Sequence, residues 1–278
     1  MKTLHFSYRM NIDFSVPVTQ HRFTLKCIPG SNQRQRLEAL SVEIYPNYFL
    51  EHAEDSFDNH CIYGYCETPH DHFSVSVTGT AVTGLSHYAT AADAYKLGMY
   101  KYATCYTKPG ESLKNYYQKL CGLFSQCFPT ANESASGHGS NYTWALFTSQ
   151  QLYQDFRYQA GTTDIHTTAE KAFSQGCGVC QDFSHIMIAL MHMSGIPARY
   201  VVGMLQGEGL SHAWVEIYEN GMWIGLDPTN NLVVSDRHIK ISHGRDYKDC
   251  TINQGFFTGN ADQRQQIRVS VTEEGTSS

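Results

Sequence analysis

The spacing of apolar residues changes along this chain, from a period of two before about residue 85 to a period near 3.6 after it. In the first part, Leu4, Phe6, Tyr8, Met10 and Ile12 alternate with polar neighbours, as in a half-buried strand. Similar runs follow over 21–28, 40–45, 60–65 and 72–82, and Pro17 is expected to end the first run. Short strands at this spacing predict an antiparallel β-sandwich or barrel.

Amphipathic helices are predicted in the second part. Residues 111–128 place apolar side chains three and four positions apart before Pro129, and 142–158 repeats the pattern. Thr167 and Glu170 are spaced as a capping box that opens a short helix over 169–173. Residues 130–140 carry two Gly and three Ser and are expected to form a surface loop. The pattern therefore predicts an N-terminal β-domain over 1–85, followed by a different domain.

Composition and charge exclude several functional classes. The 278 residues carry 20 Lys and Arg against 26 Asp and Glu, a net charge of −6, without a basic run, so we expect no nucleic-acid and no membrane-surface partner. We find no stretch of roughly 18 apolar residues and no apolar signal-peptide core at the start. Nine cysteines are scattered and odd in number, which favours reduced thiols and a cytoplasmic location. The oligomeric state stays open.

A core helix is predicted over 180–194, where nearly every residue is apolar and Gly195 and Pro197 mark the end. Its first turn carries Cys180, which follows the glycines at 176 and 178. The positive end of a helix dipole favours the thiolate form of such a cysteine. Backbone amides at the same helix end could hold an oxyanion. Cys180 is therefore a candidate nucleophile.

A β-hairpin is predicted after this helix, with strands over 211–218 and 222–227 joined by Asn220 and Gly221. A two-residue loop makes the numbers of cross-strand partners sum to 441, so His212 and Asp227 share one face as a diagonal pair. An imidazole and a carboxylate can meet there. A carboxylate that binds one ring nitrogen leaves the other to act as a base toward a thiol.

Four ordered motifs resemble the transglutaminase-like superfamily. They are GVCQDFSH at 178–185, GIPARYVVG at 195–203, HAWVEIY at 212–218 and WIGLDPTN at 223–230, with GRDYKD following at 244–249. The first 85 residues resemble the extra β-domain of the bacterial members. The resemblance implies an α+β protein whose N-terminal antiparallel β-sandwich or barrel, over 1–85, precedes a papain-like catalytic domain over 86–278.

The resemblance also implies a Cys-His-Asp triad with Cys180 as nucleophile, His212 as general base and acid, and Asp227 as the group that orients His212. Family members of this kind are cysteine peptidases or amidases. We therefore expect a thiol-dependent hydrolase that acts on a peptide or protein amide through an acyl-enzyme and needs no cofactor and no metal.

Three other functions stay open on the sequence alone. A transglutaminase-type transferase uses the same acyl-enzyme with an amine acceptor, and the motifs do not separate the two. Cys177 and Cys180 form a Cys-x-x-Cys pair that could hold a metal or a disulfide, although no second pair accompanies it. A non-catalytic scaffold that retains the fold is the third.

Several polar residues near the motifs receive structural interpretations. We expect His185 and His192 to be hydrogen-bonded packing residues, Asp182 to be a favourable charge at a helix start, and Trp214 to cover the Asp–His pair. Arg237, His238, Arg245 and Asp246 could line a cleft or form ordinary surface pairs.

Overall fold

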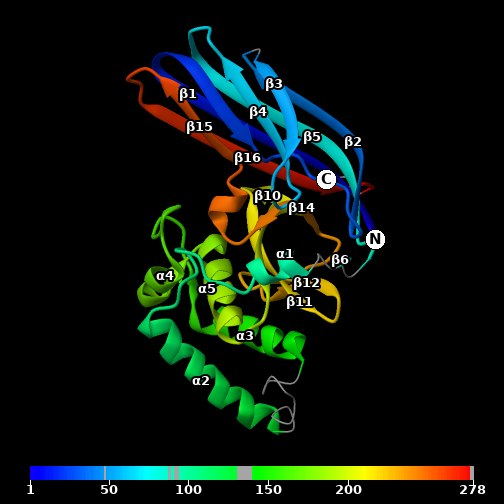
Figure 1. The fold of residues 1–278 in the computed structure, drawn as a ribbon. Coiled ribbons are helices and arrows are strands. Elements are labelled where there is room, and N and C mark those ends of the chain that lie inside the picture. Colours follow the sequence, from blue (N-terminus) through cyan, green and yellow to red (C-terminus); the bar gives the residue numbers. More distant parts are fainter. Residues whose placement is uncertain (47, 87–88, 91–93, 130–139, 276–278) are drawn as a thin grey trace.

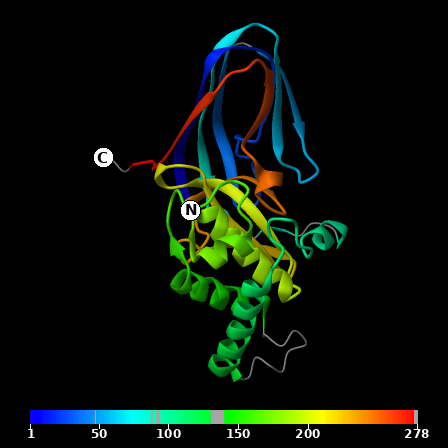
Figure 2. The same ribbon diagram turned by 90° about the vertical axis from the view of Figure 1, so that its left-hand side faces the viewer.

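The computed structural model describes residues 1–46, 48–86, 89–90, 94–129 and 140–275, in which a curled antiparallel sheet lies over a second sheet packed against helices (Figure 1). The curled sheet has eight strands in the path β10-β16-β1-β4-β3, with β15 and β5 also paired to β1 and β2 paired to β5. Their bounds are β1 Lys2–Leu25, β2 Gln35–Tyr45, β3 Phe49–Glu54, β4 His60–Cys66, β5 His70–Thr83, β10 Gly207–Gly209, β15 Asn253–Thr258 and β16 Gln263–Glu273. The expected sandwich or barrel is thus an open half-barrel (Figure 2).

Strand β1 runs for 24 residues and passes through Pro17, where the sequence pattern predicts its end. The prediction was wrong because the register with β5 shifts between Asp13 and Val18, and proline is tolerated at such an irregularity. The two predicted strands over 4–14 and 21–28 are therefore one strand that bends from one half of the sheet into the other.

The last two strands return to the N-terminal sheet. Residues 4–14 of β1 pair with β16 from Leu4 opposite Glu273 to Phe14 opposite Gln263, and β15 pairs with the second half of β1. This corrects the expected extent of the second domain, because residues 253–273 lie in the first sheet. Hydrophobic periodicity does not report which sheet a strand joins.

The second layer is a six-stranded sheet in the order β13-β12-β11-β9-β14, with β6 on β12. Its bounds are β6 Ala89–Thr90, β9 Ala198–Leu205, β11 His212–Glu219, β12 Met222–Asp227, β13 Leu232–Val233 and β14 His238–Gly244. The remaining elements are α1 Ala94–Met99, α2 Glu111–Cys127, α3 Asn141–Asp155, α4 Ala169–Gln175, α5 Cys180–Met193, the 3-10 helix η2 Tyr247–Cys250, and the parallel pair β7 Arg157–Tyr158 and β8 Cys177–Gly178. Helix α5 packs on β9 and β11 and is covered by α2, α3 and α4. It is therefore the core helix that its apolar sequence predicts.

The helix starts differ from the predicted capping box. Thr168, not Thr167, caps α4 by accepting from the Lys171 backbone N–H at 3.3 Å. The Glu170 carboxylate instead accepts from the backbone N–H groups of Gly110, Ser112 and Leu113 at the start of α2. Glu170 thus joins two helices. The loop predicted over 130–140 lies outside the described residues except for Ser140, which caps α3.

The predicted hairpin register is confirmed. Val215 pairs with Leu226 and Glu219 with Met222, so partner numbers sum to 441. Asn220 and Gly221 have φ values of 48° and 86°, the left-handed conformation that a two-residue turn of the mirror-image type requires. In the described parts of the chain, none of the helices is both long and apolar enough to cross a membrane.

Candidate active site

Cys180 is the first residue of α5 and is only partly exposed. Its position is fixed by Asp182, whose buried carboxylate accepts from the Val179 N–H at 2.8 Å and from the Thr163 hydroxyl at 2.7 Å. Gly178 is needed beside it, because a Cβ there would lie 2.4 Å from an Asp182 oxygen. Asp182, expected to be only a helix-end charge, thus holds the turn that presents the thiol.

His212 and Asp227 meet at the edge of the second sheet. His212 Nε2 lies 2.7 Å from Asp227 Oδ2, and the carboxylate is fully buried. The other carboxylate oxygen of Asp227, Oδ1, accepts hydrogen bonds from the backbone N–H groups of Thr229 and Asn230 at 3.1 and 3.2 Å. The side-chain amide of Asn230 donates to Oδ2 at 2.7 Å. Burial alone would raise the pKa of Asp227, but the hydrogen bonds from His212 and Asn230 and the nearby His238 ring hold it well below its usual range. The carboxylate is therefore ionised at neutral pH.

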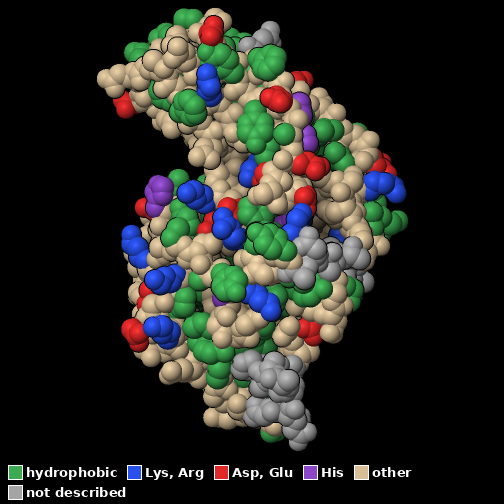
Figure 3. Space-filling model, viewed as in Figure 1, with side chains coloured by type: hydrophobic (Ala, Val, Ile, Leu, Met, Phe, Trp, Pro, Cys, Tyr) green, Lys and Arg blue, Asp and Glu red, His purple; other side chains and the backbone are tan. Residues whose placement is uncertain are grey.

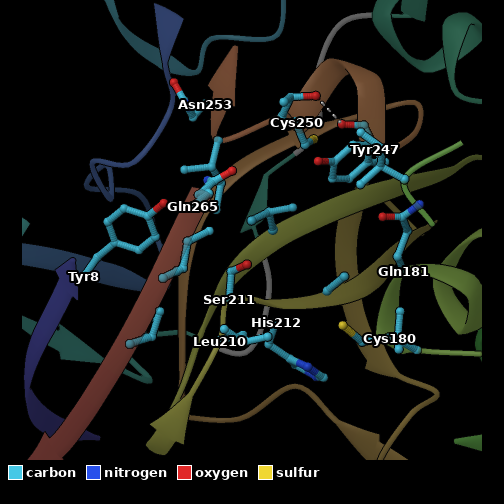
Figure 4. A pocket seen from close by; sticks show the side chains of 18 of the residues that line it. Tyr8, Cys180, Gln181, Leu210, Ser211, His212, Tyr247, Cys250, Asn253 and Gln265 are labelled. Atoms are coloured by element: carbon cyan, nitrogen blue, oxygen red, sulfur yellow. Dashed lines mark hydrogen bonds between the residues drawn. The ribbon is translucent and has the colours of Figure 1, made fainter. Parts of the chain in front are cut away.

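The structure brings Cys180, His212 and Asp227 together. In Figure 4 the Cys180 sulfur and the His212 ring face each other along one side of a pocket. Burial alone would lower the pKa of His212, but its hydrogen bond to Asp227 and the neighbouring Cys180 raise it to about 10. An Nε2–H that donates to Asp227 leaves Nδ1 to serve the thiol. The arrangement places a protonated imidazole beside the Cys180 thiol.

Two neighbours of Asp227 were missed as functional residues. Asn230 appears in the sequence only as part of a motif, yet its side chain and backbone both bind the carboxylate. His238 is one of the four residues for which the sequence left two interpretations open, lining a cleft or forming a surface pair. It is buried, and its Nε2 lies 3.5 Å from Asp227 Oδ2. An asparagine three residues after the aspartate, beyond a strand-ending proline, was a usable signal for a local hydrogen bond. No strand was predicted over 238–244, so nothing in the sequence placed His238.

The other predicted residues take structural positions. His185 is buried between the rings of Tyr106 and Tyr200, and its Nε2 accepts from the Tyr247 N–H at 3.1 Å. Burial lowers the pKa of His185 to about 3, so it is neutral. Trp214 is 1% exposed, and its ring lies 5.3 Å from that of His238.

Among the remaining candidates, Arg245 forms a surface pair with Asp249, and Asp246 caps η2 by accepting from the Lys248 N–H. His192 is largely buried near the end of α5, Arg237 is exposed, and Cys177 is a buried free thiol. The described residues contain no group of three or more His, Cys, Asp or Glu side chains placed to hold a metal ion.

A cleft of about 1200 Å³ opens beside Cys180 and His212. One wall comes from the second layer, including Gln181 and Tyr247, and the other from the curled sheet, including Tyr8 and Gln265. Figure 3 shows a hollow in the surface between the curled sheet and the second layer. The curled sheet is therefore part of the site.

Comparisons with known proteins agree with this fold. Residues 129–228 match the model of the transglutaminase-like superfamily, and residues 4–82 match that of the bacterial transglutaminase-like N-terminal region. A solved structure from Cytophaga hutchinsonii, described as a "Putative Cysteine Protease", is similar over 100% of this chain and 93% of its own, with a TM-score of 0.74 and 23% identity. At that identity the likeness shows the fold.

Uncharacterized mycobacterial proteins are related in sequence. One from Mycobacterium leprae is 35% identical over 125 residues, which cover 41% of this chain and 44% of that protein. One from Mycobacterium tuberculosis is 34% identical over 137 residues, 44% of this chain and 43% of that protein. The match thus spans less than half the length of these relatives.

Proposed function

We propose that this chain, which joins a transglutaminase-like core to a bacterial transglutaminase-like N-terminal region, is a thiol-dependent amide hydrolase. The observation that carries the proposal is the placement of His212 between the Cys180 thiol and the buried Asp227 carboxylate. Asp227 fixes the ring and stabilises its protonated form, and Cys180 lies at the start of α5, next to its free backbone N–H groups.

The proposed reaction begins with attack of the Cys180 thiolate on the substrate carbonyl carbon. The oxyanion is held by the first backbone N–H groups of α5, which have no helical acceptor. Protonated His212 gives its proton to the leaving amine as the C–N bond breaks, which leaves a thioester on Cys180. His212 then takes a proton from water, the hydroxide oxygen bonds to the acyl carbon, and the carboxylic acid leaves as the thiolate re-forms. None of these steps uses a cofactor.

The cleft supports a peptide or protein amide as the substrate. Its volume of about 1200 Å³ exceeds the roughly 300–1000 Å³ of small-ligand pockets, and it reaches from the thiol to the curled sheet. Water that enters the cleft can reach the thioester, as hydrolysis requires.

The test compares two cysteines of the same cleft. Cys105 is exposed and lines the cleft with Cys180, so Cys105→Ala is a matched control for Cys180→Ala. Both variants and the unmodified protein are assayed against a peptide library and treated with iodoacetamide over about pH 5 to 9. We expect hydrolysis to be lost only in Cys180→Ala, and Cys180 to be alkylated well below the ordinary thiol pKa of about 8.5.

Three results would count against the proposal. Hydrolysis that persists in folded Cys180→Ala would refute it, as would alkylation of Cys180 and Cys105 with the same pH profile. A product that forms only when a primary amine is added would favour the acyl transferase instead.

A further inference from the structure

A second cavity, of about 260 Å³, lies between the 30–35 segment and the second sheet. Cys180 and His212 do not line it, so it is distinct from the cleft. Its lining brings together three cationic side chains from separate parts of the chain: Arg34 before β2, Arg199 on β9 and Lys240 on β14. His238 lines it too and links it to the far side of Asp227.

Two buried amides hold the walls of this cavity together. Gln35 donates to the Lys240 carbonyl at 2.7 Å and accepts from the Lys240 N–H at 2.7 Å. Asn59 makes the same double contact with His243, donating and accepting at 2.8 Å. Both amide side chains are 3% exposed. The cavity is therefore a preformed space between two fixed elements.

The charges around the cavity do not balance. Glu216, 4% exposed, accepts from Arg199 at 2.6 Å and from Lys240 at 2.7 Å, so one carboxylate serves two cations. Arg34 donates to the Val234 carbonyl at 3.0 Å and forms no salt bridge within the described chain. Asp58, the other carboxylate of the lining, is largely exposed and paired with Lys96. Three cations thus face one buried carboxylate, an arrangement that an anion would relieve.

Positive neighbours, in addition to burial, shift the pKa values of two lining groups. Burial and the neighbouring Arg199 lower the pKa of Lys240 to about 8, although Glu216 opposes them. Burial, Lys240 and Arg199 hold the pKa of His243 well below its usual range. A bound anion would oppose both shifts.

Hydrogen-bond donors at the cavity also lack partners among the described residues. Trp214 lines the cavity, and its buried indole N–H has no acceptor among the described residues. The Arg34 guanidinium carries five N–H donors and, among the described residues, forms one hydrogen bond, to the Val234 carbonyl. Arginine presents its donors in a fork that matches planar or tetrahedral oxyanions.

We propose that this cavity is a binding site for a small oxyanion, held chiefly by Arg34 with Lys240 and Trp214 as further donors. A phosphate group and a carboxylate share the required chemistry, which is a negative charge spread over two or more acceptor oxygens. The site lies behind the candidate active site and does not depend on the proposed hydrolase activity.

The experiment titrates inorganic phosphate, and separately acetate, into the whole protein at constant ionic strength set with chloride, using calorimetry. Arg34→Gln removes the main ligand, and Arg36→Gln is the matched control, because Arg36 is two residues away, outside the lining and paired with Glu38 at the surface. We expect saturable one-to-one binding that Arg34→Gln weakens by about ten- to a hundredfold, the effect of losing a charged hydrogen bond. Arg36→Gln should leave it unchanged.

The two anions separate the possible sources. Tighter binding of phosphate than of acetate indicates a phosphorylated or free phosphate ligand, and tighter binding of acetate indicates a carboxylate ligand. Arg34→Lys, which keeps the charge but not the fork, should bind with intermediate affinity, and it provides the test if Arg34→Gln does not fold. Absence of saturable binding by either anion, or equal weakening by the Arg34 and Arg36 variants, would overturn the proposal.

Discussion

The buried carboxylate of Glu216 offers a quantitative test of the charge balance in the second sheet. Burial alone would raise its pKa, but Arg199 and Lys240 outweigh burial and lower it from 4.5 to about 2. At about 1.4 kcal/mol per pH unit, this favours the folded state by roughly 3 kcal/mol when Glu216 is ionised. Glu216→Gln removes that contribution and leaves Arg199 and Lys240 without their shared partner. Breaking a buried pair costs about 3–5 kcal/mol, so we expect a loss of stability in this range.

The sign of the pH dependence follows from the lowered pKa. The unfolded chain titrates Glu216 near 4.5 and the folded chain near 2. The stabilisation by Glu216 is therefore fully present above about pH 4.5 and is lost as the pH falls toward 2. The difference in unfolding free energy between the protein and Glu216→Gln should be constant from about pH 5 to 7 and shrink below that range.

Urea unfolding followed by circular dichroism measures the effect, with an unchanged slope against urea as evidence that the unfolded states are comparable. Glu111→Gln is the control, because Glu111 is 82% exposed and pairs with Lys114 on the helix surface, where loss of a pair costs within about 0.5 kcal/mol. The double variant Glu216→Gln/Lys240→Met removes one unpaired cation and should recover part of the loss. A loss in Glu216→Gln no larger than in the control would refute the reasoning.

Three further predictions concern the candidate active site and its supports. Asp227→Ala removes the main charge that raises the His212 pKa, so Cys180 alkylation at neutral pH should slow at least about tenfold; an unchanged rate would contradict the triad. Gly178→Ala places a Cβ against Asp182, and a folded variant should show slower alkylation of Cys180, with alkylation of Cys105 as the internal reference. Glu170→Ala leaves three backbone N–H groups at the start of α2 without their side-chain acceptor, so the free energy of unfolding measured in urea should fall by about 1–3 kcal/mol. A loss equal to that in Glu111→Ala would count against this capping role.

The local features of the active site could be predicted from the sequence because short-range rules determine them. The apolar run after Cys180 predicts α5, and Asn220-Gly221 predicts the hairpin register that places Asp227 at a strand end. Once the register is known, the meeting of His212 and Asp227 follows from strand geometry alone.

Long-range pairings could not be predicted in this way. The sequence carries no local signal that residues 263–273 pair with β1, so residues 253–273 were included in the second domain. Glu170 was interpreted as capping its own helix because capping rules consider only neighbours in sequence, whereas the structure uses it to cap α2. His238 approaches Asp227 only after β14 has joined β9.

The pairing of β1 with β16 also determines when the cleft can form. Residues 4–14 cannot pair with residues 263–273 until the latter have been synthesised. This part of the curled sheet therefore forms only after almost the whole described chain has been made. Contacts this distant in sequence are slow to form, because a long loop must close before they stabilise the fold. Gln265 on β16 is part of the wall opposite Cys180. The cleft is thus completed by a strand that is synthesised well after Cys180, and a nascent chain that already carries this cysteine does not yet have a complete cleft.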